Sequence, residues 1–134
     1  MKLEKKLLRD VMTRGVVTVP MGSTIKQIAI LLSKHSLSEA VVIGHDGSAV
    51  GVISNMDILT VIGKENWENM AAESIMTPYI ETAKPTSTLA EAARIMGDKH
   101  IHRLLIFSEQ GVGASNRPIG IVSASDIVRE VARK

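Results

Sequence analysis

Apolar residues recur three or four positions apart in two segments of the chain. These positions are Ile25, Ile28, Ala29 and Leu32 in the first segment, and Leu89, Ala92, Ala93 and Met96 in the second. This spacing lines one face of an α-helix, so each segment predicts a helix with one buried face. Thr24 with Gln27, and Thr88 with Glu91, form the pattern of a capping box, in which two side chains bind each other's free backbone N–H groups. Each helix is therefore predicted to begin next to its threonine.

Two short apolar runs follow each predicted helix. They read AVVI and VGVIS in the first half of the chain, and RLLIF and IGIVS in the second. Unbroken runs rich in β-branched residues, separated by polar or glycine-rich turns, favour central strands covered on both faces. Ser54 and Ser123 then stand at the N-caps of two further helices, which begin with DILTVI and DIVREV. With a strand before the first helix, each half is predicted to run strand, helix, strand, strand, helix.

The two halves are copies of one another. The residues that align include Met12 with Met76, Thr13 with Thr77, Ser23 with Ser87, Gly51 with Gly120, Ser54 with Ser123, and Asp57 with Asp126. Such repetition indicates a tandem duplication. One copy of about 60 residues buries little apolar surface, so the pair should share one core about a pseudo-two-fold axis. The chain divides into an N-terminal arm at 1–9, a first repeat at 10–63, a linker at 64–73 and a second repeat at 74–132.

Composition narrows the classes of protein to consider. The chain of 134 residues has no cysteine, which excludes disulfides and cysteine-based sites and fits a reducing compartment. Its sequence has no apolar run near the roughly 20 residues that cross a bilayer and no secretory signal at its start, so we expect a cytoplasmic protein without membrane association. The net charge is +2, with basic and acidic residues interleaved, and one Trp, one Tyr and one Phe are present. Nucleic-acid binding is therefore the lesser hypothesis.

Catalytic and metal-binding motifs are also missing from the sequence. There is no His-Glu-x-x-His, no Gly-x-Ser-x-Gly, no Walker-type loop and no dinucleotide fingerprint, so we expect no enzymatic activity and no required cofactor. His100 and His102 lie two positions apart, on one face of any strand. Two imidazoles without a third ligand do not define a metal site, and none is predicted.

The repeated motifs resemble those of a known family. DVMT and SIMT open the two repeats, VVTVP and IETAKP precede the first helices, HRLLIF forms a central strand, and GVISNMDI and GIVSASDI close the repeats. Taken in this order, they resemble a tandem pair of CBS (cystathionine-β-synthase) domains, also called a Bateman module, over about Asp10 to Val131. The resemblance implies an α/β fold in which two β-α-β-β-α repeats pack about a pseudo-two-fold axis into one module.

The same resemblance implies a function. Family members commonly bind adenosine nucleotides such as AMP, ADP and ATP, or related adenosyl compounds, in clefts between the two repeats, and regulate an enzyme or channel. They commonly dimerise into a flat disc. For this chain we therefore expect a non-catalytic sensor that forms a homodimer and acts on a separate protein. A dimerising adaptor with vestigial pockets is the alternative from another class.

The resemblance also places candidate ligand-binding residues. In the second repeat they are Thr82, Ala83, His102, Arg103, Leu104, Ser123, Ser125 and Asp126; a second site of lower affinity in the first repeat has Thr18, Val19, Ala40, Ser54 and Asp57. In this interpretation Asp126 accepts hydrogen bonds from the ribose hydroxyls and Arg103 grips a phosphate. Ser-x-x-Asp is equally a pattern that caps a helix, and the two roles are compatible.

The two predicted sites differ in charge. His102 and Arg103 begin the central strand of the second repeat, where the first repeat has Ser38 and Glu39. A carboxylate beside a phosphate is repulsive. We therefore expect the second-repeat site to bind nucleotides more strongly, and the first-repeat site to prefer a ligand with less negative charge.

Overall fold

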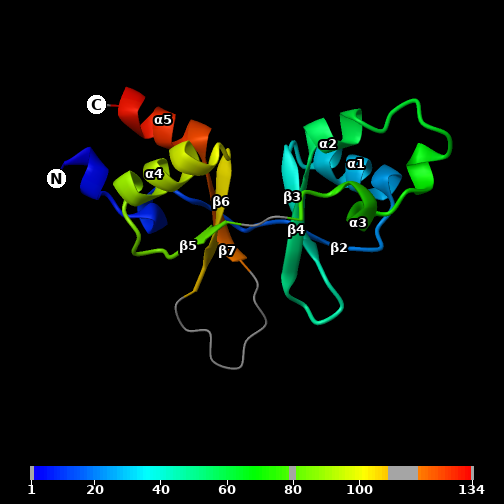
Figure 1. Ribbon diagram of the computed structural model, residues 1–134, viewed down its shortest axis with the longest axis horizontal. Coiled ribbons are helices and arrows are strands. Elements are labelled where there is room, and N and C mark those ends of the chain that lie inside the picture. Colours follow the sequence, from blue (N-terminus) through cyan, green and yellow to red (C-terminus); the bar gives the residue numbers. More distant parts are fainter. Residues whose placement is uncertain (1, 79–80, 109–117, 134) are drawn as a thin grey trace. The chain divides into compact units, whose positions relative to one another are not determined.

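The computed structural model describes residues 2–78, 81–108 and 118–133, which form two compact units (Figure 1). Unit 1 consists of Met1–Val16 together with Glu81–Lys134, and unit 2 of Val17–Ile80. The glycine-rich turn predicted between the runs RLLIF and IGIVS lies largely outside the described residues.

Unit 2 is built on a three-stranded sheet with the order β2-β3-β4. Its elements are β2 (Thr18–Pro20), α1 (Ile25–Lys34), β3 (Glu39–Ile43), β4 (Ala49–Ser54), α2 (Asn55–Leu59), the 3-10 helix η3 (Trp67–Asn69) and α3 (Ala72–Ile75). Strand β2 runs parallel to β3, and β4 runs antiparallel to it. Ile28 and Leu32 of α1 pack with Ala40 and Val42 of β3 in the core. The helical stripe predicted from the sequence thus faces the sheet.

Unit 1 repeats this plan with one additional strand. Its elements are η1 (Leu3–Lys5), η2 (Leu8–Asp10), β1 (Thr13–Arg14), β5 (Thr82–Ala83), α4 (Leu89–Lys99), β6 (Arg103–Phe107), β7 (Pro118–Ser123) and α5 (Ala124–Ala132). The strand order is β1-β7-β6-β5, with β5 parallel to β6 and the other pairs antiparallel. The predicted succession of strand, helix, strand, strand and helix is confirmed in both repeats.

The helix starts confirm most of the predicted capping. Gln27 N donates to Thr24 Oγ1 at 3.1 Å, and Thr24 N donates to Gln27 Oε1 at 2.9 Å, which completes the predicted box of α1. At α4 the prediction is half right. Glu91 N donates to Thr88 Oγ1 at 3.2 Å, but the Glu91 carboxylate accepts from the Thr88 hydroxyl instead of the backbone N–H.

The opening segment of each sequence repeat lies in the compact unit formed by the other repeat. In unit 1, Thr13 and Arg14 of β1 pair with Ile121 and Gly120 of β7, although more than a hundred residues separate them. In unit 2, residues 64–78 lie with the first repeat, and Thr77 exchanges backbone hydrogen bonds of 2.8 and 3.0 Å with Val52. The second repeat therefore gains strand β1 from the opening of the first repeat, and the first repeat gains an isolated bridge to Thr77 from the opening of the second.

A glycine in the last strand makes this exchange possible. A Cβ added to Gly120 would lie 2.7 Å from Met12 Sδ and 2.9 Å from Thr13 O. A Cβ added to Gly51 would lie 2.6 Å from Met76 Sδ and 2.8 Å from the carbonyl oxygen of the following threonine. The repeated Met-Thr and Gly of the sequence are thus two sides of one contact, present once in each unit.

The described part of the predicted N-terminal arm, residues 2–9, belongs to unit 1 and is packed against the second repeat. Leu8 is fully buried, and its backbone N–H donates to the carbonyl oxygen of Ser87 at 2.9 Å. Lys6 Nζ lies 2.8 Å from Glu130 Oε2, which ties this segment to α5. The hydrogen bond from Lys6 is the main reason that the pKa of Glu130 lies below its ordinary 4.5, against an opposing effect of burial.

Replacing Gly120 with alanine tests the close contact. The Met12 side chain can bend away, but the carbonyl oxygen of Thr13 belongs to the β1 backbone, so the strand itself must shift. We expect Gly120→Ala to lower the free energy of unfolding by about 1–3 kcal/mol, as measured by urea denaturation. Gly97→Ala is the control, because its Cβ meets nothing within 4 Å inside α4 and should be neutral or stabilising. Equal effects of the two substitutions would contradict the proposed constraint.

The Lys6–Glu130 contact predicts a pH dependence of stability. A carboxyl group whose pKa is lowered by folding stabilises the protein above its ordinary pKa, and this contribution disappears as the pH falls through the folded-state pKa. Glu130→Gln should therefore lower the Tm at about pH 7, and the difference from the unmodified chain should fade below about pH 4. Thermal unfolding between these pH values measures it. The exposed Glu4, changed to Gln, is the control; a Glu130→Gln effect that is constant over the range would disprove the assignment.

Candidate functional site

The predicted site residues of the second repeat gather where β6 begins and β7 ends. Arg103, the first residue of β6, is opposite Ser123, the last residue of β7 and the N-cap of α5. The backbone N–H of Ala124 donates to the carbonyl oxygen of His102 at 2.8 Å. The antiparallel pairing thus brings an imidazole, a guanidinium and a helix N-terminus to one end of the sheet.

Ser123 and Asp126 form a capping box at this helix start. Ser123 Oγ accepts from the backbone N–H of Asp126 at 3.2 Å, and Asp126 Oδ2 accepts from the backbone N–H of Ser123 at 2.9 Å. Ser125 Oγ lies 2.9 Å from Ser123 Oγ. The capping role of Ser-x-x-Asp is therefore confirmed. Asp126 Oδ2 makes the capping bond, and Oδ1 contacts a second residue.

Sequence analysis missed that partner, Arg129. Its Nη1 lies 3.0 Å from Asp126 Oδ1, and the guanidinium side chain is 67% exposed whereas the carboxylate is 12% exposed. Residues three apart on a helix share a face, so the spacing of Asp126 and Arg129 in the sequence was a readable signal. A ligand hydroxyl that binds Asp126 Oδ1 must share it with Arg129 or displace it. Displacement costs little, because an exposed i,i+3 ion pair is screened by water.

The first repeat has the same geometry without this arginine. Glu39 of β3 is opposite Ser54, the N-cap of α2, and the backbone N–H of Asn55 donates to the carbonyl oxygen of Ser38 at 2.9 Å. Asp57 Oδ2 accepts from Ser54 N at 2.8 Å and from Ser54 Oγ at 3.1 Å. Asp57 Oδ1 accepts no hydrogen bond from any residue that the structure describes. The two carboxylates therefore differ in how much of each is already engaged.

The remaining predicted residues lie in the adjoining strands. Thr82 and Ala83 form β5 and pair with β6, while Thr18 and Val19 lie on β2 and pair with β3. Ala40 and Leu104 are fully buried in the hydrophobic cores of their own units. Their side chains face away from any ligand, so these two residues could contribute only backbone groups. Thr18 and Thr82 are exposed, so a ligand can reach their side chains from solvent.

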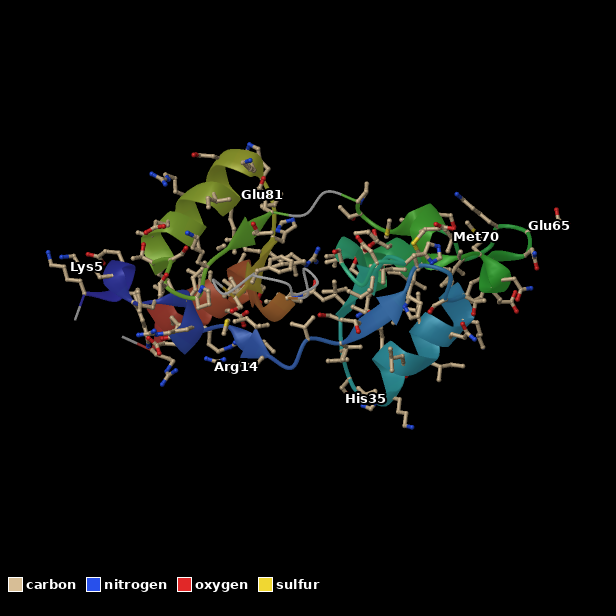
Figure 2. All side chains as sticks on the ribbon, turned by 90° about the horizontal axis from the view of Figure 1, so that it is seen from below. Lys5, Arg14, His35, Glu65, Met70 and Glu81 are labelled. Carbon is tan, nitrogen blue, oxygen red and sulfur yellow. The ribbon has the colours of Figure 1, made fainter. Side chains whose placement is uncertain are left out.

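Other ionisable side chains lie on the segments next to β5 and β6. Lys99 Nζ lies 2.6 Å from Glu81 Oε1 just before β5, where Glu81 is labelled in Figure 2. His102 is exposed, and His100 holds a left-handed backbone with φ of 53° at the end of α4. Among the residues that the structure describes, no three histidine, aspartate or glutamate side chains form a metal-binding group. No described helix is long and apolar enough to cross a membrane.

Comparison with known proteins identifies the repeats. The family model of the CBS domain matches residues 8–64 and again residues 72–133. A homoserine O-acetyltransferase of Methanococcoides burtonii is 31% identical over 120 residues, which are 90% of this chain and 23% of that enzyme. An uncharacterized protein of Methanopyrus kandleri is 27% identical over 122 residues, which are 60% of its length. The chain thus spans less than two thirds of each of these relatives.

Solved structures share the fold. An uncharacterized conserved protein from Pyrococcus horikoshii is 26% identical, with a TM-score of 0.81 over 100% of this chain and 96% of that chain. The CBS domain pair of protein MJ0100, in complex with 5-methylthioadenosine and S-adenosyl-L-methionine, is 23% identical, with a TM-score of 0.80 over 96% and 97% of the chains. The CBS domain of a bacterial CNNM/CorC family Mg2+ transporter, in complex with ATP, is 20% identical, with a TM-score of 0.82 over 97% and 89%.

Proposed function

The chain belongs to the CBS domain family, and from this premise we propose that it is a non-catalytic regulatory module that binds an adenosine nucleotide or a related adenosyl compound. The observation that carries the proposal is the arrangement at the start of α5, where the strand register puts Arg103 opposite Ser123 and the Ser123 backbone N–H donates to Asp126. Two structural relatives with the same fold hold adenosyl ligands, namely ATP in one and S-adenosyl-L-methionine with 5-methylthioadenosine in the other.

The groups of this cluster match the polar parts of such a ligand. The two ribose hydroxyls are donors, and Asp126 Oδ1 is a charged acceptor that the capping bond does not use, although the exposed Arg129 side chain contacts it. Arg103 presents a planar fork of N–H donors that suits the oxygens of a phosphate. With the carboxylate bound to the ribose and the guanidinium bound to the phosphate, the ligand would bind in one orientation.

Regulation follows if ligand binding favours one conformation of the module over another. A ligand shifts such an equilibrium only by its difference in affinity for the two states. The cluster lies at the first turn of α5, so a bound ligand would act directly on the position of this helix. The proposed output is a change in the affinity of the module for a separate regulated protein.

A dimerising adaptor that binds no ligand is the second candidate. It is favoured by the capping bonds, because both Ser-Asp pairs stabilise helix starts whether or not a ligand binds. In that case the two Ser-Asp pairs would serve only to stabilise the helix starts. Ligand titration separates the two functions, since the adaptor would bind none of the adenosyl compounds.

Titration of two matched variants tests the proposed site. Loss of a hydrogen bond to a charged group costs roughly 1.5–3 kcal/mol, so Asp126→Ala should weaken nucleotide binding by about ten- to a hundredfold. Asp57→Ala should weaken it much less, because Glu39 stands where the second repeat has Arg103. Isothermal titration calorimetry with AMP, ATP and S-adenosylmethionine measures both variants against the unmodified chain.

Asp57→Ala is also the structural control, because it removes the same capping bonds from the other repeat. Equal losses in the two variants, or a larger loss for Asp57→Ala, would contradict the predicted asymmetry. Absence of binding by all three compounds to the unmodified chain would contradict the proposed function and favour the adaptor.

We also propose that the module forms a homodimer. The last helix of each repeat, and the turn that follows it in the first repeat, carry large apolar side chains that remain exposed in the single chain. These residues are Met56, Leu59 and Ile62 in the first repeat, and Val128 and Val131 in the second, with exposed fractions of 53–68%. Apolar surface of this kind is typical of an interface between subunits.

Sedimentation equilibrium at micromolar concentration tests the dimer. We expect twice the chain mass of 14.5 kDa for the unmodified protein, and a shift toward the monomer for Leu59→Lys, which places a charge in the apolar surface. Thr60→Lys is the control, since Thr60 is an exposed polar neighbour on the same segment. A monomer of 14.5 kDa for the unmodified chain would contradict this part of the proposal.

A further inference from the structure

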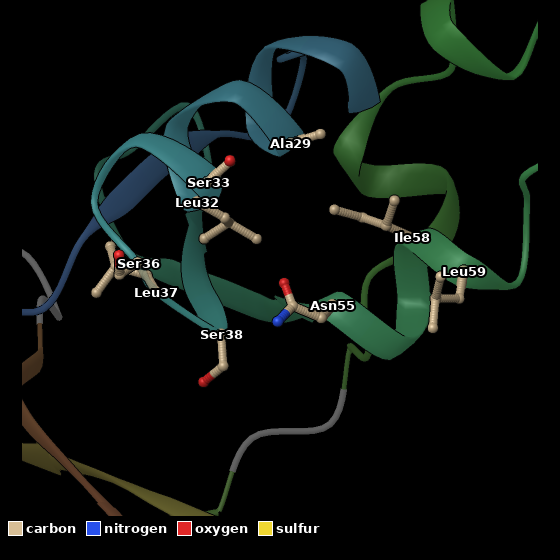
Figure 3. A pocket seen from close by; sticks show the side chains of 9 residues that line it. All are labelled: Ala29, Leu32, Ser33, Ser36, Leu37, Ser38, Asn55, Ile58 and Leu59. Carbon is tan, nitrogen blue, oxygen red and sulfur yellow. The ribbon is translucent and has the colours of Figure 1, made fainter.

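A pocket opens between α1 and α2, wholly within unit 2 (Figure 3). It is an open depression of about 600 Å³, a volume within the range of sites for small molecules. Its lining residues are Ala29, Leu32, Ser33, Ser36, Leu37, Ser38, Asn55, Ile58 and Leu59. None of the five residues assigned to the first-repeat nucleotide site is among them.

The pocket has an apolar floor and a polar rim. Leu32 and Ile58 are 2% and 8% exposed, and in Figure 3 they point into the space between the two helices. Ser33, Ser36 and Asn55 are exposed, and their side chains form no hydrogen bond with any residue that the structure describes. Their donors and acceptors are therefore available to a ligand that rests on the apolar floor.

The lining excludes charged ligands. None of the nine lining side chains carries a charge, so an ionic group placed on the floor would lose its hydration without gaining a counter-charge. The Asn55 carboxamide offers a donor and an acceptor side by side, which complements a primary amide or the edge of a heterocycle. The chemistry fits a flat, uncharged ring compound with an adjacent donor and acceptor.

This polar set is particular to the first repeat. The positions that align with Ser33, Ser36 and Asn55 in the second repeat hold Gly97, His100 and Ala124. The backbone is the same in both copies at one of these positions, because Ser36 and His100 share a left-handed conformation with φ of 53°. Folding of the repeat therefore does not require the serine and asparagine side chains that line the pocket.

We propose that the pocket between α1 and α2 is a second binding site, which takes an uncharged aromatic amide or a heterocycle of similar hydrogen-bonding pattern. The proposal does not rest on nucleotide binding, since the pocket shares with the first-repeat cluster only its edge, at Ser38 and Asn55, and none of the five residues assigned there to a nucleotide. The competing occupant is an apolar side chain from a second copy of the chain, because Leu59 both lines the pocket and belongs to the exposed apolar surface.

Disulfide exchange at an introduced thiol tests the site. The chain has no cysteine, so Ser33→Cys carries a single thiol at the pocket rim. The protein is equilibrated under mild reductant with a benzamide on a disulfide linker, and intact-protein mass spectrometry gives the labelled fraction. Labelling by the bare linker is the reference at each position, which cancels differences in thiol reactivity.

We expect the benzamide to label Ser33→Cys about tenfold more than the bare linker does. Ser74→Cys is the control, because Ser74 is exposed in the same unit and outside the pocket, and there the ratio should be near one. A benzoate on the same linker should show no gain over the bare linker, because it carries a charge. Adding Asn55→Ala to Ser33→Cys should reduce the benzamide ratio severalfold.

Three results would overturn the proposal. The first is an equal ratio at Ser33→Cys and Ser74→Cys, which would mean that the pocket contributes nothing. The second is a preference for benzoate over benzamide, which would contradict the ligand class. The third is a ratio that falls as the protein concentration rises through the range where sedimentation shows dimers, which would assign the pocket to the second copy.

Discussion

The close contact between a glycine in the last strand and a methionine-threonine segment controls the rest of each unit. Gly51 and Gly120 each lie three residues before a capping serine on the same strand. The exchanged segment packs against the glycine, so it fixes the strand whose final residue begins the last helix. The helix start carries the carboxylate of the candidate site. A side chain at the glycine position would therefore disturb the site through the backbone, even though it touches no ligand group.

The Ser-x-x-Asp motif serves the fold first and the ligand second. One carboxylate oxygen of Asp126 is held by the backbone N–H of Ser123, which orients the other oxygen. Preorganisation of this kind favours binding, because the side chain has already lost its rotamer freedom before the ligand arrives. The same bond means that a variant of Asp126 loses helix stability as well as affinity. For this reason binding must be compared between the matched aspartates of the two repeats.

The two copies of the Ser-x-x-Asp motif differ in which part of a nucleotide they favour. The second repeat has Arg103 for a phosphate, but Arg129 already contacts Asp126 Oδ1. The first repeat leaves Asp57 Oδ1 without a hydrogen bond from the described residues, but it has Glu39 where a phosphate contact would be needed. Charge should decide between them for nucleotides, since the Arg129 ion pair is exposed and readily displaced. For an uncharged nucleoside that advantage of the second repeat disappears.

Local features of the fold could be predicted from the sequence, whereas distant pairings could not. The helical stripes and the caps at Thr24, Ser54 and Ser123 depend on residues at most seven positions apart, and the structure confirms them. The exchange of opening segments depends on Thr13 meeting Ile121, which no local pattern encodes. The capping box at Thr88 was half wrong because a threonine and a glutamate have more than one way to bond.

Some features of the candidate site could also be predicted from the sequence, and others could not. The family resemblance predicted that Arg103 and Ser123 belong to one site, and the register of β6 and β7 places them opposite each other. Burial of Ala40 and Leu104 agrees with the unbroken apolar runs AVVI and RLLIF, which predicted covered strands, whereas the family motif alone placed both residues at the ligand. The pocket between α1 and α2 was also beyond prediction. It arises from the spacing of two helices that are joined by two strands and a turn.

The N-terminal segment is held on unit 1 chiefly by apolar burial, and its ion pair is secondary. Leu8 is fully buried, and a leucine side chain removed from water contributes about 1.5–3 kcal/mol. The Lys6 side chain is 34% exposed, so water and salt screen its attraction to Glu130. Acid or salt should therefore loosen the contact with α5 and leave the segment bound. Since the ion pair and the Ser123–Asp126 cap lie on the same helix, a ligand that moves α5 meets weak resistance there and firmer resistance where β1 pairs with β7.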